Sequence, residues 1–92
     1  MNDNQSAISA ALRAAGIACS DWSEGVVLVD GWREDHDLRV SAWVAFDPDG
    51  DHTLVDIESA DLDGDIDYLV ESLPIEDLDY IVEQVKRILA GA

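Results

Sequence analysis

Carboxylates recur at the spacing of a calcium-binding loop between Asp47 and Glu58. Counted from Asp47, acidic residues occupy positions 1, 3, 5 and 12, which supply oxygen ligands in the twelve-residue helix–loop–helix calcium motif. Position 6, where that motif needs glycine for its sharp turn, holds His52 instead. The segments on both sides have the alternation of strands and not the periodicity of helices. A hairpin turn explains the same pattern, so a calcium site formed by Asp47, Asp49, Asp51 and Glu58 is the weaker alternative.

A second acidic segment, 61–67, carries aspartate at every other position. It lacks the bidentate glutamate that would complete a calcium loop, because Ser72 stands at that position. Aspartate is among the preferred residues at a helix N-cap, so Asp63 or Asp65 is expected to cap a helix that follows.

Residues for nucleophilic or metal-dependent catalysis are sparse. Cys19 could pair with His36 or His52 as a thiolate, but no strand–turn–helix elbow or glycine cluster surrounds it to form an oxyanion hole. Two histidines without thiolates at suitable spacing do not predict a zinc site. A lone cysteine is usually a small buried hydrophobe, and it allows no disulfide within the chain. We therefore expect a protein that is not an enzyme and that uses no cofactor.

The first half of the chain predicts one helix followed by strands. Apolar residues at helical spacing predict a helix over residues 5–15, which a glycine then ends. The β-branched run 26–29 predicts a strand, and alternation predicts a second strand over 38–46. Proline and glycine in 47–51 predict a hairpin turn, after which 53–58 predicts a third strand.

The second half predicts two helices. Apolar residues of the segment 66–73 recur at i, i+3, i+4 and i+7, the periodicity of an amphipathic helix. After Pro74, a similar spacing and a charge order that suits the helix dipole predict a last helix from Ile75 to Gly91. The predicted fold is a single small two-layer α+β domain over residues 1–92, in the order α-β-β-β-α-α. A three-stranded antiparallel meander is packed by helices on one face.

The chain is strongly acidic, and its charge is unevenly distributed. It has 21 Asp and Glu against 5 Lys and Arg in 92 residues, which gives a net charge of −16. Residues 1–46 (seven acids, three Arg) account for −4 and residues 47–92 (fourteen acids, one Lys, one Arg) for −12. Direct binding to nucleic acid or to a membrane surface is not expected, because both need Lys and Arg to neutralise phosphate. The hydrophobic share of 48% excludes a disordered acidic tail.

Three explanations for this charge stay open. The acids imitate phosphates and bind a basic nucleic-acid-binding protein or complex, or they adapt a structural or regulatory protein of a halophile to high salt, or they only keep a small domain in solution. The uneven distribution favours imitation, because salt adaptation should spread acids over every exposed face. The residues expected to stand in for phosphates are Asp61, Asp63, Asp65, Asp67, Glu71, Glu76, Asp77, Asp79 and Glu83.

In its size, in the acidic segment 47–83 and in its lack of enzymatic motifs, the chain resembles the small acidic DNA mimics that phages encode as anti-CRISPR and anti-restriction inhibitors. The resemblance implies an inhibitor that blocks the nucleic-acid groove of a CRISPR effector or similar nuclease. The predicted element order is also similar to the double-stranded RNA-binding fold. The helix that is basic in that fold carries Asp65, Asp67 and Glu71 here, so RNA binding does not follow.

Trp43 is a candidate anchor for the same partner. It has the opposite parity to Val40 and Val44, so it faces outward if that parity faces the helices. Tryptophan is enriched at the centre of protein interfaces, although a homodimer could also cover this side chain. Trp22 and Trp32 lie in predicted connections and are expected to cover edges of the core.

The N-terminal residues and the length of the apolar runs indicate where in the cell the protein is expected. The polar N-terminus has neither the basic nor the apolar region of a signal peptide, and the apolar runs are too short to span a membrane. We expect a cytoplasmic protein without a membrane partner, located in the host cytoplasm if it is phage-encoded.

Overall fold

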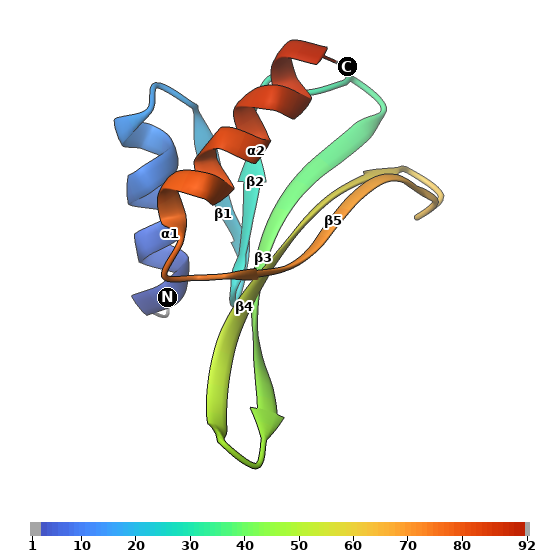
Figure 1. The fold of residues 1–92 in the computed structure, drawn as a ribbon. Helices are drawn as coiled ribbons and strands as arrows, with labels where there is room; N and C mark the ends of the chain where they lie inside the picture. Colours follow the sequence, from blue (N-terminus) through green and yellow to red (C-terminus); the bar gives the residue numbers. More distant parts are fainter. Residues whose placement is uncertain (1–2, 92) are drawn as a thin grey trace.

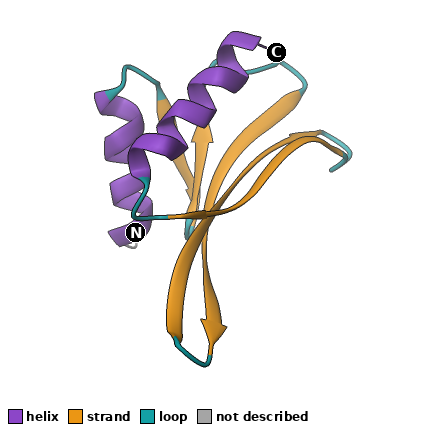
Figure 2. Ribbon diagram, viewed as in Figure 1, coloured by secondary structure: helices purple, strands orange, loops and turns teal. Residues whose placement is uncertain are grey.

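Along the chain, an antiparallel meander of strands follows one helix and precedes another. The computed structural model describes residues 3–91, apart from the side chain of Tyr68. In chain order the elements are α1 (Asp3–Ala14), β1 (Cys19–Ser23), β2 (Val26–Val29), β3 (His36–Asp47), β4 (Gly50–Asp61), β5 (Ile66–Pro74) and α2 (Leu78–Gly91). Each strand pairs antiparallel with the next, so the described residues form one five-stranded sheet in the order β1-β2-β3-β4-β5. Both helices lie on one face of this sheet and leave the other face open (Figure 1, Figure 2).

The core lies between the helices and one face of the sheet. Every second residue of each central strand points to this face, because successive side chains of a strand alternate. These residues meet the apolar stripes of the two helices, whose members recur at helical spacing. The most deeply buried apolar side chains are Ile8, Leu12, Val27, Val29, Leu38, Val40, Val55, Ile57, Ala60, Ile81, Val85 and Ile88.

A buried glutamine ties α1 to the sheet in addition to the apolar stripe. The Gln5 side chain accepts a hydrogen bond from the Gly25 N–H at 3.1 Å and donates to the carbonyls of Ser23 and Val26 at 3.0 and 3.1 Å. These bonds satisfy backbone groups of the β1–β2 turn, which the helix would otherwise bury without partners.

The predicted end of the first helix is confirmed. Gly16 has a φ of 81°, and its N–H bonds to the Arg13 carbonyl at 3.0 Å. The Ile17 N–H bonds to the Leu12 carbonyl at 2.9 Å, which completes the pair of bonds that ends a helix through a left-handed glycine. Ile17 then enters the core with 8% of its surface exposed.

The predicted hairpin turn is also confirmed, and its strands are longer than predicted. Asp47 pairs with Gly50 at the end of the β3–β4 ladder, with Pro48 and Asp49 in the turn between them. Gly50 has a φ of 128°, a conformation that favours glycine, and the Asp47 carboxylate accepts the Asp49 N–H at 3.0 Å. The tip of this hairpin projects beyond both helices (Figure 1).

The helix predicted over 66–73 is wrong, because this segment forms β5 at one edge of the sheet. Its pairing with β4 explains the misleading periodicity. Val70 pairs with Ile57 and Leu73 pairs with Val55, so β5 has three residues where β4 has two. A β-bulge of this kind returns a strand to the same face after three residues and thereby produces the i, i+3 spacing of a helix.

The domain is α+β with an antiparallel sheet packed by helices, as predicted, but it has two helices where three were predicted, and its element order is α-β-β-β-β-β-α. The described chain has five strands where three were predicted, because both edge strands were missed. The polar strand β1 has no apolar alternation, since only Cys19 is buried among its five residues. The last helix begins at Leu78 and not at Ile75, because a turn closed by the Asp77 N–H and the Pro74 carbonyl precedes it.

Candidate functional site

Eight of the nine predicted phosphate-mimicking residues lie near the two ends of the edge strand β5, and Glu71 lies within the strand. Four of the eight lie in the β4–β5 turn or in the strand residues beside it, namely Asp61, Asp63, Asp65 and Asp67. The other four, Glu76, Asp77, Asp79 and Glu83, follow the strand in the β5–α2 turn and on α2. β5 has nine residues, so its ends are roughly 26 Å apart at about 3.3 Å per residue. The structure therefore divides the expected surface into two acidic clusters joined by a strand edge.

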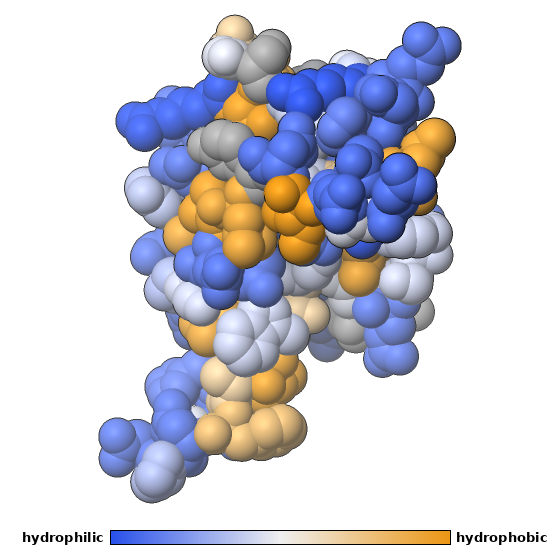
Figure 3. Space-filling view, turned by 90° about the vertical axis from the view of Figure 1, so that its right-hand side faces the viewer, coloured by the Kyte–Doolittle hydropathy of each residue, from blue (hydrophilic) through white to orange (hydrophobic). Residues whose placement is uncertain are grey.

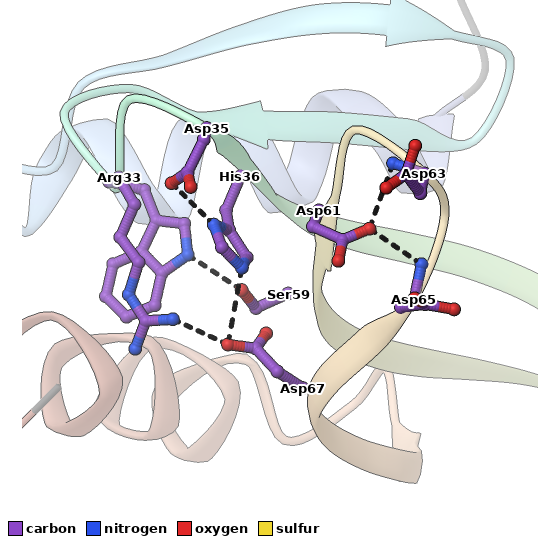
Figure 4. Close-up of polar contacts among 9 residues, drawn as sticks. Arg33, Asp35, His36, Ser59, Asp61, Asp63, Asp65 and Asp67 are labelled. Atoms are coloured by element: carbon purple, nitrogen blue, oxygen red, sulfur yellow. Dashed lines mark hydrogen bonds and ion pairs between the residues drawn. The ribbon is translucent and has the colours of Figure 1, made fainter.

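Asp61 stabilises the backbone of the first acidic cluster. Its Oδ1 accepts hydrogen bonds from the backbone N–H groups of Asp63 and Asp65, both at 2.9 Å (Figure 4). The predicted helix cap is wrong, because Asp61 is the acceptor and it stabilises a turn between two strands. Asp63 and Asp65 cap no helix, because none follows them, and their side chains are exposed.

Asp67 is the one member of the nine that forms an ion pair among the described residues. Arg33 Nη1 lies 2.5 Å and His36 Nε2 lies 3.6 Å from Asp67 Oδ2 (Figure 4). A hydrogen bond from Ser59 and the Arg33 guanidinium hold the pKa of Asp67 below its ordinary value of 3.8. A hydrogen bond from the His36 ring at 2.8 Å lowers the pKa of Asp35 in the same way. This cluster ties the β2–β3 connection to β5.

The second acidic cluster surrounds the start of α2. Asp77 immediately precedes the helix, and its carbonyl accepts the Ile81 N–H at 3.0 Å. Glu76, Asp77, Asp79 and Glu83 are all exposed, and no ion pair reaches any of them within residues 3–91. Carboxylates near a helix N-terminus are stabilised by the helix dipole, which offsets part of the repulsion within this cluster.

The four residues of the alternative calcium site are not brought together. Asp47, Asp49 and Asp51 lie at the hairpin tip, whereas Glu58 lies seven residues further along β4. The Glu58 carboxylate lies 3.6 Å from Arg39 on the open face of the sheet. Within residues 3–91, no three His, Cys, Asp or Glu side chains are placed to hold a metal ion together.

Trp43 faces outward as expected, because the parity of Val40 faces the helices. It is 40% exposed on the open face of the sheet, where it lies directly opposite Leu54. Trp32 covers an edge of the core, as predicted, and its Nε1 donates to Ser59 Oγ at 2.8 Å. Trp22 is instead 53% exposed in β1, with the Arg39 guanidinium 4.6 Å from its ring centroid.

Another exposed aromatic residue lies on the projecting hairpin and was not predicted to be exposed. Phe46 has 79% of its surface exposed, although it shares the parity of the buried Leu38 and Val40. The space-filling view shows the hairpin projecting from the domain with apolar side chains gathered on one side and hydrophilic ones at its tip (Figure 3). The alternation of residues 38–46 predicts correctly which face of β3 carries Phe46. It does not predict that the helices stop covering this face before Phe46 is reached.

Comparison with protein-family models, with curated proteins and with solved structures finds no match. No helix in the described part of the chain is both long and apolar enough to cross a membrane.

Proposed function

We propose that this protein is a non-enzymatic inhibitor that acts in the cytoplasm by binding a basic, nucleic-acid-handling protein. Its carboxylates would occupy the Lys and Arg groove that otherwise holds DNA or RNA, as in a CRISPR effector or a similar nuclease. The observation that carries the proposal is that eight of the nine acids around β5 have no ion pair among the described residues. Carboxylates without a cation of their own are available to the cations of a partner.

The arrangement of these acids specifies how such a partner would be engaged. Two clusters roughly 26 Å apart along an edge strand fit two groups of Lys and Arg along a groove, since protein grooves for nucleic acid are lined by cations at many points along the phosphate backbone. Attraction over this distance would speed association at low salt and weaken as salt screens it. Trp43 lies on the open sheet face and would contribute apolar contact beside the charged edge.

A second candidate function is favoured by the acids outside β5. Exposed carboxylates also lie in the β2–β3 connection and at the hairpin tip, for example Glu34, Asp35 and Asp49. Acids at nearly every turn are what adaptation of a structural or regulatory protein to high salt would produce. The distribution of isoelectric points across the source proteome separates the two functions, because only adaptation requires that most of its proteins be acidic.

The proposal is tested by reversing charge at both ends of β5. The variant Asp63→Lys, Asp65→Lys, Glu76→Lys, Asp79→Lys leaves Asp61 and Asp67 in place, because these two support the turn and the Arg33 pair. The partner is captured from host lysate with the wild-type protein, and displacement of its labelled duplex DNA or RNA is then measured. Each reversal should weaken displacement up to about fivefold, the effect of an exposed ion pair.

The control is Glu24→Lys with Asp30→Lys, which reverses exposed acids at the opposite edge of the sheet from β5. It should displace nucleic acid as the wild type does. Circular dichroism confirms that each variant is folded. Undiminished displacement by the folded quadruple variant would exclude β5 as the inhibitory surface.

A further inference from the structure

The core-facing stripe of β3 continues beyond the helix layer. Alternate residues of a strand share one face, so Leu38, Val40, Val44 and Phe46 all lie on the face that the helices cover. Leu38 and Val40 are fully buried, whereas Val44 is 44% and Phe46 is 79% exposed. Exposure therefore rises along a single face of one strand, and the chemistry of the side chains stays apolar throughout.

The helix layer ends where exposure begins. Asn4, in the first turn of α1, donates a hydrogen bond to Thr53 Oγ1 at 3.5 Å. Thr53 is paired directly with Val44, so the start of α1 lies over this pair. Phe46 lies two residues further toward the tip, in the part of the hairpin that projects beyond both helices (Figure 1).

Carboxylates surround the exposed apolar side chains of Val44 and Phe46. Asp51 is paired directly with Phe46, and Asp47 follows Phe46 in the chain. On the neighbouring side, the Ile75 N–H bonds to the Thr53 carbonyl at 3.2 Å, which places the following Glu76 beside the hairpin. In the described structure the only ion pair among these three acids is that of Asp47 with His52 Nε2, at 3.1 Å.

We propose that the inner face of the β3–β4 hairpin, defined by Val44 and Phe46, docks an amphipathic helix of the partner protein. The apolar stripe of that helix would cover the two side chains and extend the helix layer over the hairpin. Lys and Arg on both sides of the stripe would meet the carboxylates at the tip and after β5. The proposal rests on the proposed function only for the basic character of the partner.

The charge of the chain argues against a second copy as the occupant. Each copy carries a net charge of −16, and docking hairpin to hairpin would bring the surrounding carboxylates of both copies together. A basic helix meets the same surface with opposite charge, and burial of Phe46 adds apolar contact that charge alone does not supply.

A pair of synthetic peptides tests this site without knowledge of the partner. The first is a fluorescein-labelled helical peptide of Leu and Lys, with Leu in one stripe and Lys on both flanks. The second has the same composition in an order that forms no stripe. Both have the same charge, so fluorescence anisotropy with the full chain separates recognition of the stripe from attraction to an acidic protein. The wild type should bind the striped peptide about tenfold tighter.

Two matched variants locate the binding. Phe46→Ser removes the exposed aromatic side chain of the hairpin, whereas Leu62→Ser removes a side chain of similar exposure, 81%, at the β4–β5 turn. Neither changes charge or the buried core. Phe46→Ser should abolish the preference for the striped peptide, and Leu62→Ser should keep it.

Other results would overturn the proposal. Equal binding of both peptides, or a preference that survives in Phe46→Ser, would exclude a helix-docking face on the hairpin. Sedimentation equilibrium of the wild type showing a dimer that Phe46→Ser dissociates would assign this face to a second copy. The charge reversals on β5 remove Glu76, so the separate variant Asp63→Lys, Asp65→Lys tells the two proposals apart, because it should weaken displacement of nucleic acid and leave the peptide preference unchanged.

Discussion

Asp61 and Asp67 are identical side chains six residues apart, and the fold uses them in different ways. Asp61 accepts two backbone N–H groups and holds the β4–β5 turn, whereas Asp67 binds Arg33 across the sheet edge. Asp63 and Asp65, between them, are exposed and have no ion pair in the described structure. The alternation of four aspartates predicts none of this, because the role of each depends on the turn geometry and on the distant Arg33.

The ion pair and hydrogen bonds of Asp67 predict a pH dependence at the residue scale. Its pKa is lowered in the folded protein, so its stabilising effect is present above the ordinary value of 3.8 and is lost as pH falls through the lower folded value. Carboxyl NMR titration of Asp67 should give a midpoint below 3.8. Arg33→Gln should raise the midpoint only part of the way, because the hydrogen bond from Ser59 is the larger cause. A wild-type midpoint at or above the ordinary value would contradict the observed contacts.

At the scale of elements, the central strands were predictable and the edge strands were not. β2, β3 and β4 carry β-branched runs or alternation between recognisable turns, and these patterns report one buried face. β1 buries only Cys19, so it has no such pattern. β5 has two irregularities in its pairing with β4, and the one opposite Asp56 places Val70 and Leu73 on one face three residues apart, at helical spacing. Tertiary pairing of this kind leaves no local signal.

The bulge of β5 makes Ser72 sensitive to substitution. Ser72 has a φ of 60°, and its N–H donates to Asp56 Oδ1 at 2.9 Å. Ser72→Val should lower the free energy of unfolding by about 1–2 kcal/mol, because a β-branched residue is strained in the left-handed region. Ser72→Gly should change the free energy of unfolding by less than about 0.5 kcal/mol. Glycine relieves strain in the folded state, but it also increases the conformational entropy of the unfolded chain, and the two effects oppose each other. Urea unfolding measures both.

A neighbouring residue provides the control for this prediction. Glu71→Val introduces the same side chain at an exposed position of β5 that lacks a positive φ. It should leave the urea midpoint nearly unchanged or raise it, because valine favours extended backbone. If Ser72→Val were as stable as Glu71→Val, the bulge would not have the described conformation.

At the scale of the whole molecule, the sequence predicted how much charge the domain carries but not where it gathers. The contiguous segment 47–83 suggested one surface, yet antiparallel strands place successive turns at opposite ends of the sheet. The hairpin tip and the β4–β5 turn are thereby separated by the length of β4, which has twelve residues. Dividing the acids in this way lowers their repulsion, which helps a domain of net charge −16 to stay folded.

Repulsion among the remaining acids predicts that salt stabilises the fold. The screening length falls from about 30 Å at 0.01 M to about 3 Å at 1 M, so repulsion between turns is lost over this range and the Tm should rise. Neutralising exposed acids in the more acidic half, with Asp63→Asn and Asp65→Asn, should raise the Tm at low salt and flatten its salt dependence. The matched pair Glu24→Gln and Glu34→Gln should do so less, because residues 1–46 carry −4 and residues 47–92 carry −12. Calorimetry in NaCl and KCl separates screening, which is equal in both, from binding of one cation. A Tm that falls with salt, or equal effects of the two pairs, would mean that repulsion is not concentrated in the second half of the chain.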